Sequence, residues 1–387
     1  MEVPFVYGKI AFEPEFTDRE DDLQWLLSNF EAGNNTILIS PRRWGKSSLV
    51  SKAIAQYATK RNEVVCCSID LFSVRTEEEF YKLFAEEVLK ATQNTMEKIQ
   101  EVLKSFLGKF IPRVSYGMDG VNDISIGLDW KEVVKNPDQI LDLPEKIAEQ
   151  KGVRIIICID EFQNIAVFED PLAFQKKLRS RWQKQKSSSY CLYGSKRHMM
   201  LDVFTKPSMP FYKFGDIRFL EKISGENWIK FILKRFADTG KVISENLAGH
   251  IALLVDNHPH YVQQLAQKAW LFTKKACNET VVEQAHDSLM RHLSGLFQMI
   301  TDSLSNTQIN LLQALVAGEH QFTTKEVIEK YKLSSSANVT RARKALVDKE
   351  VLDVVDNKLI FLDPVYSAWL KRYYFKMEPL KPADKQP

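Results

Sequence analysis

One segment near the N-terminus contains the residue types that hold the phosphates of a nucleotide. An apolar run at residues 36–39 and a turn precede Gly45-Lys46-Ser47, which opens an amphipathic stretch. In a phosphate-binding loop, backbone N–H groups and the positive end of the next helix surround the phosphates. The Lys reaches the β and γ oxygens, and the hydroxyl coordinates Mg²⁺. Lys46 and Ser47 are therefore expected to bind ATP or GTP with Mg²⁺, although Ser40 replaces the first Gly of the pattern G-x-x-x-x-G-K-[ST].

A second segment, residues 154–163, places two carboxylates after a buried strand. Four isoleucines and a Cys follow one another without a break, which is typical of a strand covered on both faces of a parallel sheet. Such a strand delivers the next residues to the carboxyl edge of the sheet, where ligands bind. Asp160 suits a metal ion held through water beside Lys46 and Ser47. Glu161 can orient or deprotonate a water that attacks the γ-phosphate.

The alternative interpretation of Asp160 and Glu161 is two surface acids that cap the next helix. It is less favoured because a strand, loop and helix with Gly-Lys-Ser precede them in the chain. A nucleotide kinase would not normally need the second acid. We therefore favour hydrolysis over transfer of the phosphoryl group to another molecule.

The composition sets broad limits on the class of protein. The 387 residues, 44% hydrophobic, provide material for about two to three domains. The formal charge of +3 neither requires nor excludes nucleic acid. The five cysteines show no C-x-x-C spacing, which indicates buried thiols in a reducing compartment, and the seven histidines show no metal-ligand spacing. Without a long apolar stretch or a signal-peptide layout, a cytoplasmic protein that does not enter a membrane is expected.

Strand and helix patterns alternate through the first half of the chain. This alternation predicts an α/β fold with a mostly parallel sheet and helices on both faces. A capping box at Thr76 and Glu79 marks the beginning of one helix. A hairpin insertion is expected near 113–130, around an Asp119-Gly120 turn. The expected strands are 36–40, 64–71, 154–159 and 189–194, with a helix expected at 46–58 and a helical region at 76–107.

The second half of the chain has two helical patterns. From about Ser224 apolar residues recur at helical spacing, which predicts a small bundle. Beyond Thr307, three short helical patterns precede two strand-like runs separated by Asp356-Asn357. Three helices followed by a β-wing make a winged helix-turn-helix.

The helix expected from Ser336 separates an inward face from an outward face. Its outward face suits phosphates and base edges, which makes DNA contacts possible. Winged helices also dock proteins, and Asp348 weakens the positive field, so a protein partner stays open. The outward residues expected to contact DNA are Asn338, Thr340, Arg341 and Lys344.

With these motifs in this order, the whole chain resembles the AAA+ ATPases of the archaeal-type ATP-binding family, prokaryotic relatives of the origin-recognition and STAND NTPases. Residues 16–20 are similar to the family's N-terminal box, which packs near the adenine. Residues 40–49 resemble its phosphate loop, and residues 159–163 resemble its hydrolytic strand end. Residues 190–195 look like the strand whose polar end contacts the γ-phosphate or the attacking water, which makes Ser195 the expected sensor.

The resemblance extends to the C-terminal half, with departures. Residues 257–263 are similar to the family's lid motif Gly-x-Pro, whose Pro approaches the base, so Pro259 is expected there. Asn257 replaces the lid Gly, and both Asn257 and Ser40 are types that tolerate turn geometry. Lys213 stands where many relatives carry Arg, and Lys cannot make a bidentate fork to phosphate. No trans-acting arginine can therefore be assigned.

A densely basic region between the two strand ends has two interpretations. It is either a solvated helix face or an interface for DNA or a neighbouring subunit's nucleotide. The region consists of Arg179, Arg181, Lys184, Lys186, Lys196 and Arg197.

The resemblance implies a P-loop AAA+ parallel sheet with a helical lid and a C-terminal winged helix-turn-helix. The expected divisions are a strap at 1–33, an ATPase core at 34–223, the lid at 224–303, the winged helix at 304–375 and a flexible tail at 376–387. Glu161, Ser195 and Lys46 are the expected catalytic residues, and Ser47 and Asp160 the expected Mg²⁺ ligands. The expected nucleotide-binding residues are Pro41, Arg42, Arg43, Trp44, Gly45, Lys46, Ser47, Ser48 and Pro259.

The implied function is an ATP-dependent switch with slow hydrolysis. The alternative is a nucleotide-gated DNA-binding or regulatory adaptor that hydrolyses negligibly. A ring motor is a third possibility, which needs a trans arginine. ATP and Mg²⁺ are the expected ligands, and DNA or a protein is the expected partner of the winged helix. The oligomeric state is not predicted.

Overall fold

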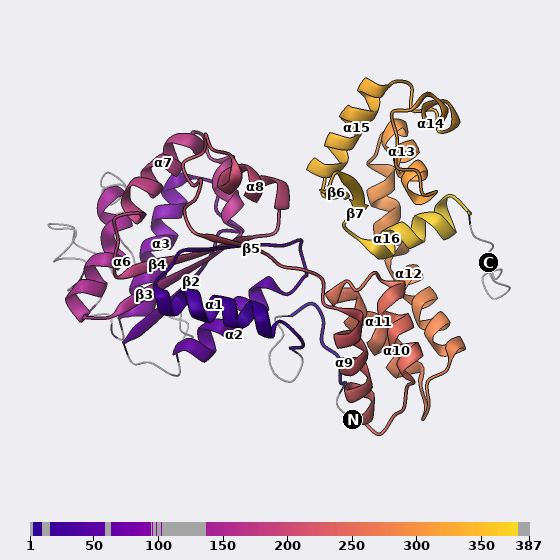
Figure 1. Ribbon diagram of the computed structural model, residues 1–387, viewed down its shortest axis with the longest axis horizontal. Coiled ribbons are helices and arrows are strands. Elements are labelled where there is room, and N and C mark those ends of the chain that lie inside the picture. The colour runs from indigo at the N-terminus through magenta and orange to yellow at the C-terminus, as the bar shows by residue number, and fades with distance from the viewer. Residues whose placement is uncertain are drawn as a thin grey trace, which may run out of the picture. The chain divides into compact units, whose positions relative to one another are not determined.

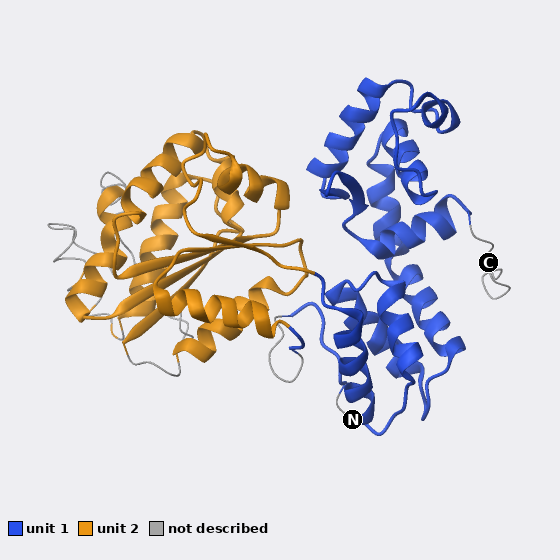
Figure 2. Cartoon of the chain, in the orientation of Figure 1, with its two compact units in different colours: residues 1–18, 222–387 blue, residues 19–221 orange. Residues whose placement is uncertain are grey.

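The computed structural model describes residues 3–9, 16–58, 63–93, 95, 98, 102 and 137–377. The expected insertion near 113–130 lies outside the described residues, as does most of the tail at 376–387. The chain divides into two compact units (Figure 2). One comprises residues 19–221, and the other comprises residues 1–18 together with 222–387.

The unit of residues 19–221 is built on a five-stranded parallel sheet with the order β2-β3-β4-β1-β5. The α/β fold and the parallel sheet are confirmed. The edge strand β5 was not predicted, because its alternation of charged and apolar types covers only four residues and it pairs only with β1. The strands are β1 (Thr36–Ile39), β2 (Val64–Asp70), β3 (Arg154–Asp160), β4 (Ser188–Gly194) and β5 (Asp216–Phe219).

Helices cover both faces of this sheet, with α1 and α2 on one side and α7 and α8 on the other (Figure 1). Large aromatic residues fill the core, and Trp182 stacks on Tyr190 with ring centroids 4.0 Å apart. The helices are α1 (Glu20–Ala32), α2 (Lys46–Ala58), α3 (Glu77–Thr92), α6 (Pro137–Lys151), the 3₁₀ helix η1 (Phe162–Val167), α7 (Pro171–Trp182) and α8 (Arg197–Thr205).

Helix α3 begins as the capping box predicts, with the Thr76 hydroxyl accepting from the backbone N–H of Glu79. The helical region expected over 76–107 is interrupted after α3, which ends at Thr92 where Gln93 has extended backbone, and Lys98 and Val102 are helical again. Lys151 donates to the backbone carbonyl of Thr92. This contact satisfies a carbonyl that the helix leaves without an internal partner at its end.

The other unit contains the helical bundle and the winged helix-turn-helix, whose two strands pair antiparallel around Asp356-Asn357. Both turn residues have left-handed backbone, with φ 49° and 63°, as a two-residue hairpin turn requires. The bundle helices are α9 (Gly225–Ala237), α10 (Glu245–Leu254), α11 (Pro259–Phe272) and α12 (Glu279–Asp302). The winged part comprises α13 (Asn306–Val316), α14 (Lys325–Lys330), α15 (Ser336–Asp348), β6 (Leu352–Val355), β7 (Lys358–Phe361), α16 (Pro364–Trp369) and the π-helix η2 (Leu370–Tyr374).

The N-terminal residues 3–9 pack onto the helical bundle of this same unit. The Phe5 side chain is buried in the bundle core, beside the rings of Phe231 and Phe236. The backbone N–H of Val6 donates to Gln263 at 3.1 Å. No helix in the described ranges has the length and apolar character that crossing a membrane requires.

Candidate functional site

The strand order brings the sequence-predicted residues to one edge of the sheet. Strand β4 lies between β1 and β3, with Gly194 level with Ile39 and Leu192 level with Ile159. Because all three strands are parallel, the residues that follow them emerge side by side. The loop after β1, the carboxylates at the end of β3 and Ser195 after β4 therefore share one site.

The loop after β1 has the backbone form expected of a phosphate loop. Left-handed backbone occurs at Arg43, with φ 63°, and at Gly45, with φ 88°, whereas Ser40 is not among the residues with positive φ. The Gly-to-Ser change at position 40 is therefore tolerated without backbone strain. Helix α2 begins at Lys46, so the N–H groups of its first turn have no partner inside the helix. These donors suit phosphate oxygens.

Side chains around the loop differ in exposure. The Lys46 side chain is 6% exposed, and Ser48 and Pro41 are buried. Arg42 and Arg43 are exposed, and Trp44 is half-buried. These positions are compatible with the predicted contacts to a nucleotide, which stay predictions.

Ser47 and Asp160 meet at the point where a metal ion is expected. The Ser47 hydroxyl donates to Asp160 Oδ2 at 2.7 Å, and the backbone N–H of Glu161 donates to Asp160 Oδ1 at 2.8 Å. Burial raises the pKa of the Asp160 carboxyl, and Lys46 and the Ser47 hydroxyl oppose that rise. A cation beside this carboxylate would favour its charged form.

The oxygen donors fit Mg²⁺, which takes one or two protein ligands besides phosphate and water. Ser47 and Asp160 would hold it, and it would supply positive charge to the phosphates when bound. In the part of the chain that the structure describes, no group of three or more His, Cys, Asp and Glu side chains could hold a metal ion.

Glu161 is held by several contacts in a left-handed backbone conformation, with φ 52°. Such a conformation costs a residue of this type on the order of 1–3 kcal/mol and tends to occur at functional sites. Its Oε1 lies 4.0 Å from Lys46 Nζ. Its Oε2 accepts from the Ser195 hydroxyl at 2.9 Å and from the Gln163 amide. The carboxylate is thus fixed next to the cation expected to bind phosphate.

Ser195 is 5% exposed and connects two expected site residues. It donates to Glu161, and it accepts from Arg42 Nε at 3.4 Å. Its hydroxyl therefore links the expected base to the loop after β1, and the sensor role that the resemblance implies stays a prediction.

Replacing Ser195 by Ala should lower turnover roughly tenfold to a hundredfold, because Glu161 loses a donor worth about 1.5–3 kcal/mol. The difference between the ATP-bound and ADP-bound states should also diminish, while ADP affinity hardly changes. Phosphate release and ADP calorimetry on the variant measure both quantities. An equal loss of ADP binding would indicate a folding role for the hydroxyl instead.

Pro259 belongs to the other compact unit. It is the first residue of α11 and is buried. Asn257, two residues earlier, has φ 54°, so it adopts the left-handed backbone that the replaced Gly would favour. The expected approach of Pro259 to the base stays a prediction.

The arginines of the basic region have partners within the chain. Arg181 forms ion pairs with Asp142 and, at 3.5 Å, with Asp138. The Arg179 guanidinium lies over the ring of Phe214, 4.8 Å from its centroid. These contacts favour a structural role on the helix face over a contact with another subunit's nucleotide. Lys213 is exposed and has left-handed backbone, with φ 54°.

Helix α15 presents the residues expected to contact DNA on its outer side. Arg341 and Lys344 are exposed, whereas Val339 and Leu346 are buried. Asn338 is half-buried. The exposed Thr340 hydroxyl donates to the Ser336 carbonyl at 3.0 Å, so it could serve a nucleic acid only as an acceptor in this rotamer.

Gln163 and Gly194 are site residues that sequence reasoning missed. Gln163 was noticed only as part of a motif, and Gly194 only as a strand residue. The signal for Gln163 is its position two residues after Glu161, because a 3₁₀ turn at this point allows its side chain to contact the Glu161 carboxylate. The signal for Gly194 is weaker, because its importance depends on which side chain lies against it.

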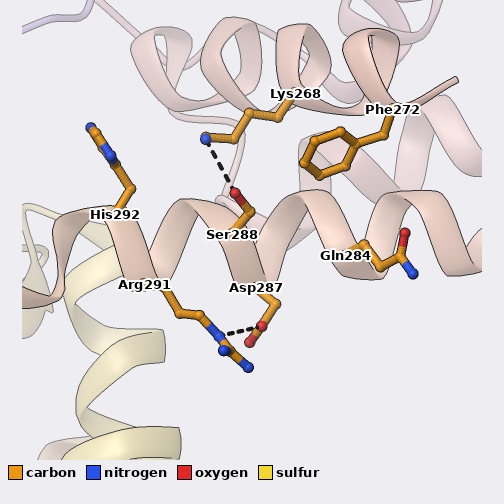
Figure 3. Close-up of a pocket in the computed structure, with 7 residues that line it drawn as sticks. All are labelled: Lys268, Phe272, Gln284, Asp287, Ser288, Arg291 and His292. Atoms are coloured by element: carbon orange, nitrogen blue, oxygen red, sulfur yellow. Dashed lines mark hydrogen bonds and ion pairs between the residues drawn. The ribbon is translucent and has the colours of Figure 1, made fainter. Parts of the chain in front are cut away.

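A cavity of about 640 Å³ lies between α11 and α12, away from these residues in sequence (Figure 3). Four of its polar side chains form two pairs. Lys268 donates to Ser288 at 3.3 Å, and Arg291 pairs with Asp287 at 2.8 Å. The cavity therefore offers few unpaired charges for a ligand.

Comparison with known families gives two matches along the chain. A family described as an ATPase domain predominantly from Archaea matches residues 16–209, about half of the chain. A family described as a probable winged helix domain matches residues 295–372. No curated protein matches the sequence.

Solved structures with the same fold cover nearly the whole chain. The Walker-type ATPase of Pyrococcus abyssi is 16% identical, with a TM-score of 0.67 and coverage of 96% of this chain and 100% of that one. The Aeropyrum pernix ORC2 protein, solved in ADPNP–ADP complexes, is 13% identical, with a TM-score of 0.54 and coverage of 96% and 98%. The ORC1 protein of the same organism, solved in complex with DNA, is 13% identical, with a TM-score of 0.51 and coverage of 98% and 100%. At these identities the likeness shows the fold.

Proposed function

The chain belongs to the archaeal-type AAA+ ATPase family, and from this membership we propose that it binds and hydrolyses ATP as a nucleotide-dependent switch. The observation that carries the proposal is the meeting of three side chains at one sheet edge. Glu161 lies 4.0 Å from Lys46 and accepts from Ser195 at 2.9 Å. A cation, a carboxylate and a hydroxyl in this arrangement can position a triphosphate and the water that attacks it.

Each residue has its own part in the proposed reaction. Lys46 and the N–H groups that begin α2 bind the phosphate oxygens. Glu161 orients the attacking water and takes its proton. Ser195 contacts the γ-phosphate or that water, so its bond to Glu161 depends on which nucleotide is present.

The competing proposal is a nucleotide-gated adaptor that hydrolyses negligibly. The fixed carboxylate of Glu161 favours hydrolysis, because binding alone needs no base aligned beside Lys46. Steady-state phosphate release separates the two proposals. A ring motor is less supported, since it needs a trans-acting arginine that has not been assigned. Arg181, in the basic region, forms ion pairs with two acidic residues of its own chain. Light scattering with a non-hydrolysable nucleotide would test for assembly.

Arg19 supports the proposal that nucleotide state is transmitted beyond the phosphate loop. Its guanidinium is buried and donates to the Trp44 carbonyl at 3.2 Å and to the Glu221 carbonyl at 2.5 Å. Trp44 belongs to the loop, and Glu221 is the last residue of the sheet unit. A shift of the loop on hydrolysis would therefore reach the chain segment that leads into the lid and the winged helix.

Small-angle scattering tests this transmission. The Glu161→Gln variant with Mg-ATP should hold the proposed closed state, and the wild type with ADP should hold the open one. The proposal expects two distinct scattering profiles. Superimposable profiles would show that nucleotide state does not change the arrangement of the two units.

The winged helix is proposed to bind DNA in a manner set by the nucleotide. Support comes from the exposed cations on α15 and from the fold shared with an ORC1 protein solved in complex with DNA. A protein partner is the alternative for the same surface. The two are distinguished by whether binding weakens with salt as phosphate contacts require.

Neutralising Arg341 and Lys344 together should weaken DNA binding by about 1–3 kcal/mol if one of them reads a base edge. The dependence of log K on log salt should become shallower by about one unit for each lost phosphate contact. Folding should hardly change, because both side chains are exposed. ATPase activity without DNA should stay the same. Fluorescence anisotropy at several salt concentrations measures these quantities.

A matched control removes two cations of the same unit outside the winged helix, with Lys274 and Lys275 changed to Ala. Both are exposed, and this variant should bind DNA as the parent does. Unchanged DNA binding in the double variant at α15 would favour a protein partner for this surface. The absence of salt-dependent DNA binding by the wild-type protein in both nucleotide states would favour a protein partner as well.

The proposed location is the cytoplasm. All five cysteines are free thiols, and Cys158 and Cys191 are fully buried in neighbouring strands. Such thiols are compatible with a reducing compartment.

A further inference from the structure

Gln163 is a fully buried amide that touches the carboxylate expected to act as the base. Its Nε2 donates to Glu161 Oε2, the same oxygen that accepts from Ser195 at 2.9 Å. Its Oε1 is buried and has no hydrogen-bond partner among the residues that the structure describes. The amide is therefore held through its donor end.

The orientation of this amide follows from chemistry and from packing. Facing a carboxylate, a carboxamide must present its N–H group, because its oxygen would be repelled. The opposite end of the amide then points at Gly194, the last residue of β4. A Cβ at position 194 would come within 1.9 Å of Gln163 Oε1 and 2.8 Å of Met200 Sδ. The space for the amide thus exists because residue 194 is a glycine.

The Gln163 amide and the Ser195 hydroxyl both donate to the same oxygen of the Glu161 carboxylate. Oε2 receives both hydrogen bonds, while Oε1 is the oxygen on the side of Lys46, 4.0 Å from its Nζ. Because Oε2 accepts from both Ser195 and Gln163, the carboxylate cannot rotate without breaking a buried hydrogen bond. Oε1 is then kept in place to accept a proton from water.

We propose that Gln163 is a positioning residue for ATP hydrolysis, which fixes the Glu161 carboxylate from inside the protein while Gly194 provides its space. The inference rests on the proposed ATPase function. Gln163 does not touch the reacting atoms, because it lies in the core beneath Glu161 and acts only through that carboxylate.

The first test replaces Gln163 by Met, which keeps the length of the side chain and its burial but removes the donor. We expect kcat to fall roughly tenfold or more, as for loss of a hydrogen bond to a charged group. KM for ATP and ATP affinity by calorimetry should stay within about twofold, because no phosphate contact is lost. The matched control is Gln175→Met. Gln175 is also buried with a buried Oε1 that lacks a partner in the described residues, but it lies in α7.

A double-mutant cycle distinguishes positioning from a general structural role. In the Glu161→Gln background, measured by single turnover with excess protein, adding Gln163→Met should cause no further loss of rate. A residue that merely supported the fold would lower the rate by the same factor in both backgrounds.

The second variant, Gly194→Ala, should displace the amide without changing Gln163 itself. It should reproduce the fall in kcat, and combining it with Gln163→Met should add little. Gly295→Ala is its control, because a Cβ there meets nothing within 4 Å. If Gln163→Met fails to fold, as judged by its melting temperature, Gly194→Ala decides the question.

The outcomes separate this role from the proposed function. An active wild type with unchanged kcat in Gln163→Met would overturn the positioning role alone. Equal losses in the wild-type and Glu161→Gln backgrounds would overturn it as well. A wild type without phosphate release would overturn the ATPase and this role with it.

Discussion

Replacing Lys46 by Ala is expected to abolish binding of Mg-ATP. The Lys46 side chain is 6% exposed at the beginning of α2, and it supplies the compact cation of the phosphate loop. Without it, the triphosphate would face the carboxylates of Asp160 and Glu161 with the Mg²⁺ ion, backbone N–H groups and the exposed Arg42 and Arg43 to offset their charge, but with no lysine on its β and γ oxygens. Calorimetric titration with Mg-ATP measures the loss.

The control for this variant is Lys176→Ala, which removes an exposed lysine of the same unit and should leave ATP affinity unchanged. The melting temperature of Lys46→Ala should be recorded without nucleotide, so that unfolding is not mistaken for lost binding. Retained affinity for Mg-ATP in a folded Lys46→Ala protein would refute the site.

Replacing Glu161 by Gln should leave ATP bound while turnover falls by roughly 10² or more. The carboxamide keeps the shape of the side chain, and its oxygen can still accept from Ser195 and Gln163. What it cannot do is take a proton from water. ATP should therefore bind and persist, as shown by calorimetry together with single-turnover phosphate release.

Glu169→Gln is a suitable control, because Glu169 is an exposed acid a short distance along the chain. Its turnover should equal that of the wild type. Wild-type turnover in Glu161→Gln would mean that the water is activated elsewhere.

The sequence was most informative where a local pattern determines the structure. The unbroken apolar run before Asp160 predicts a buried strand, and β3 extends from Arg154 to Asp160. The helix after Gly45 begins at Lys46, as the loop motif requires. The winged helix was also predictable, because its three helical patterns and the Asp356-Asn357 turn are short-range signals. In each case neighbouring residues alone specify the element.

Features that depend on distant pairing were not predictable. Strand β5 offers only a four-residue alternation of charged and apolar types, and it exists through its pairing with β1. The end of α3 at Thr92 depends on contacts that include Lys151 from another helix. Similarly, the contact between Gln163 and Glu161 needs the left-handed backbone at Glu161 and the glycine at the end of β4. Only the sheet order places β4 beside β3.

The relation of Pro259 to the nucleotide illustrates a different limit. The role of Pro259 is assigned by resemblance to a lid motif. A proline has no charge and no hydrogen-bond donor from which a bound ligand could be predicted. Sequence patterns describe faces within an element. They do not fix the distance between a lid and a phosphate loop in separate units.

We propose that this chain hydrolyses ATP at the site formed by Lys46, Glu161 and Ser195. The most direct test is steady-state phosphate release by the wild-type protein at saturating Mg-ATP, on a preparation whose nucleotide binding has been counted by calorimetry. We expect each occupied site to release several phosphates in succession as ADP is exchanged for fresh ATP. Full binding of ATP with no phosphate release would contradict it and leave the chain as a nucleotide-gated adaptor.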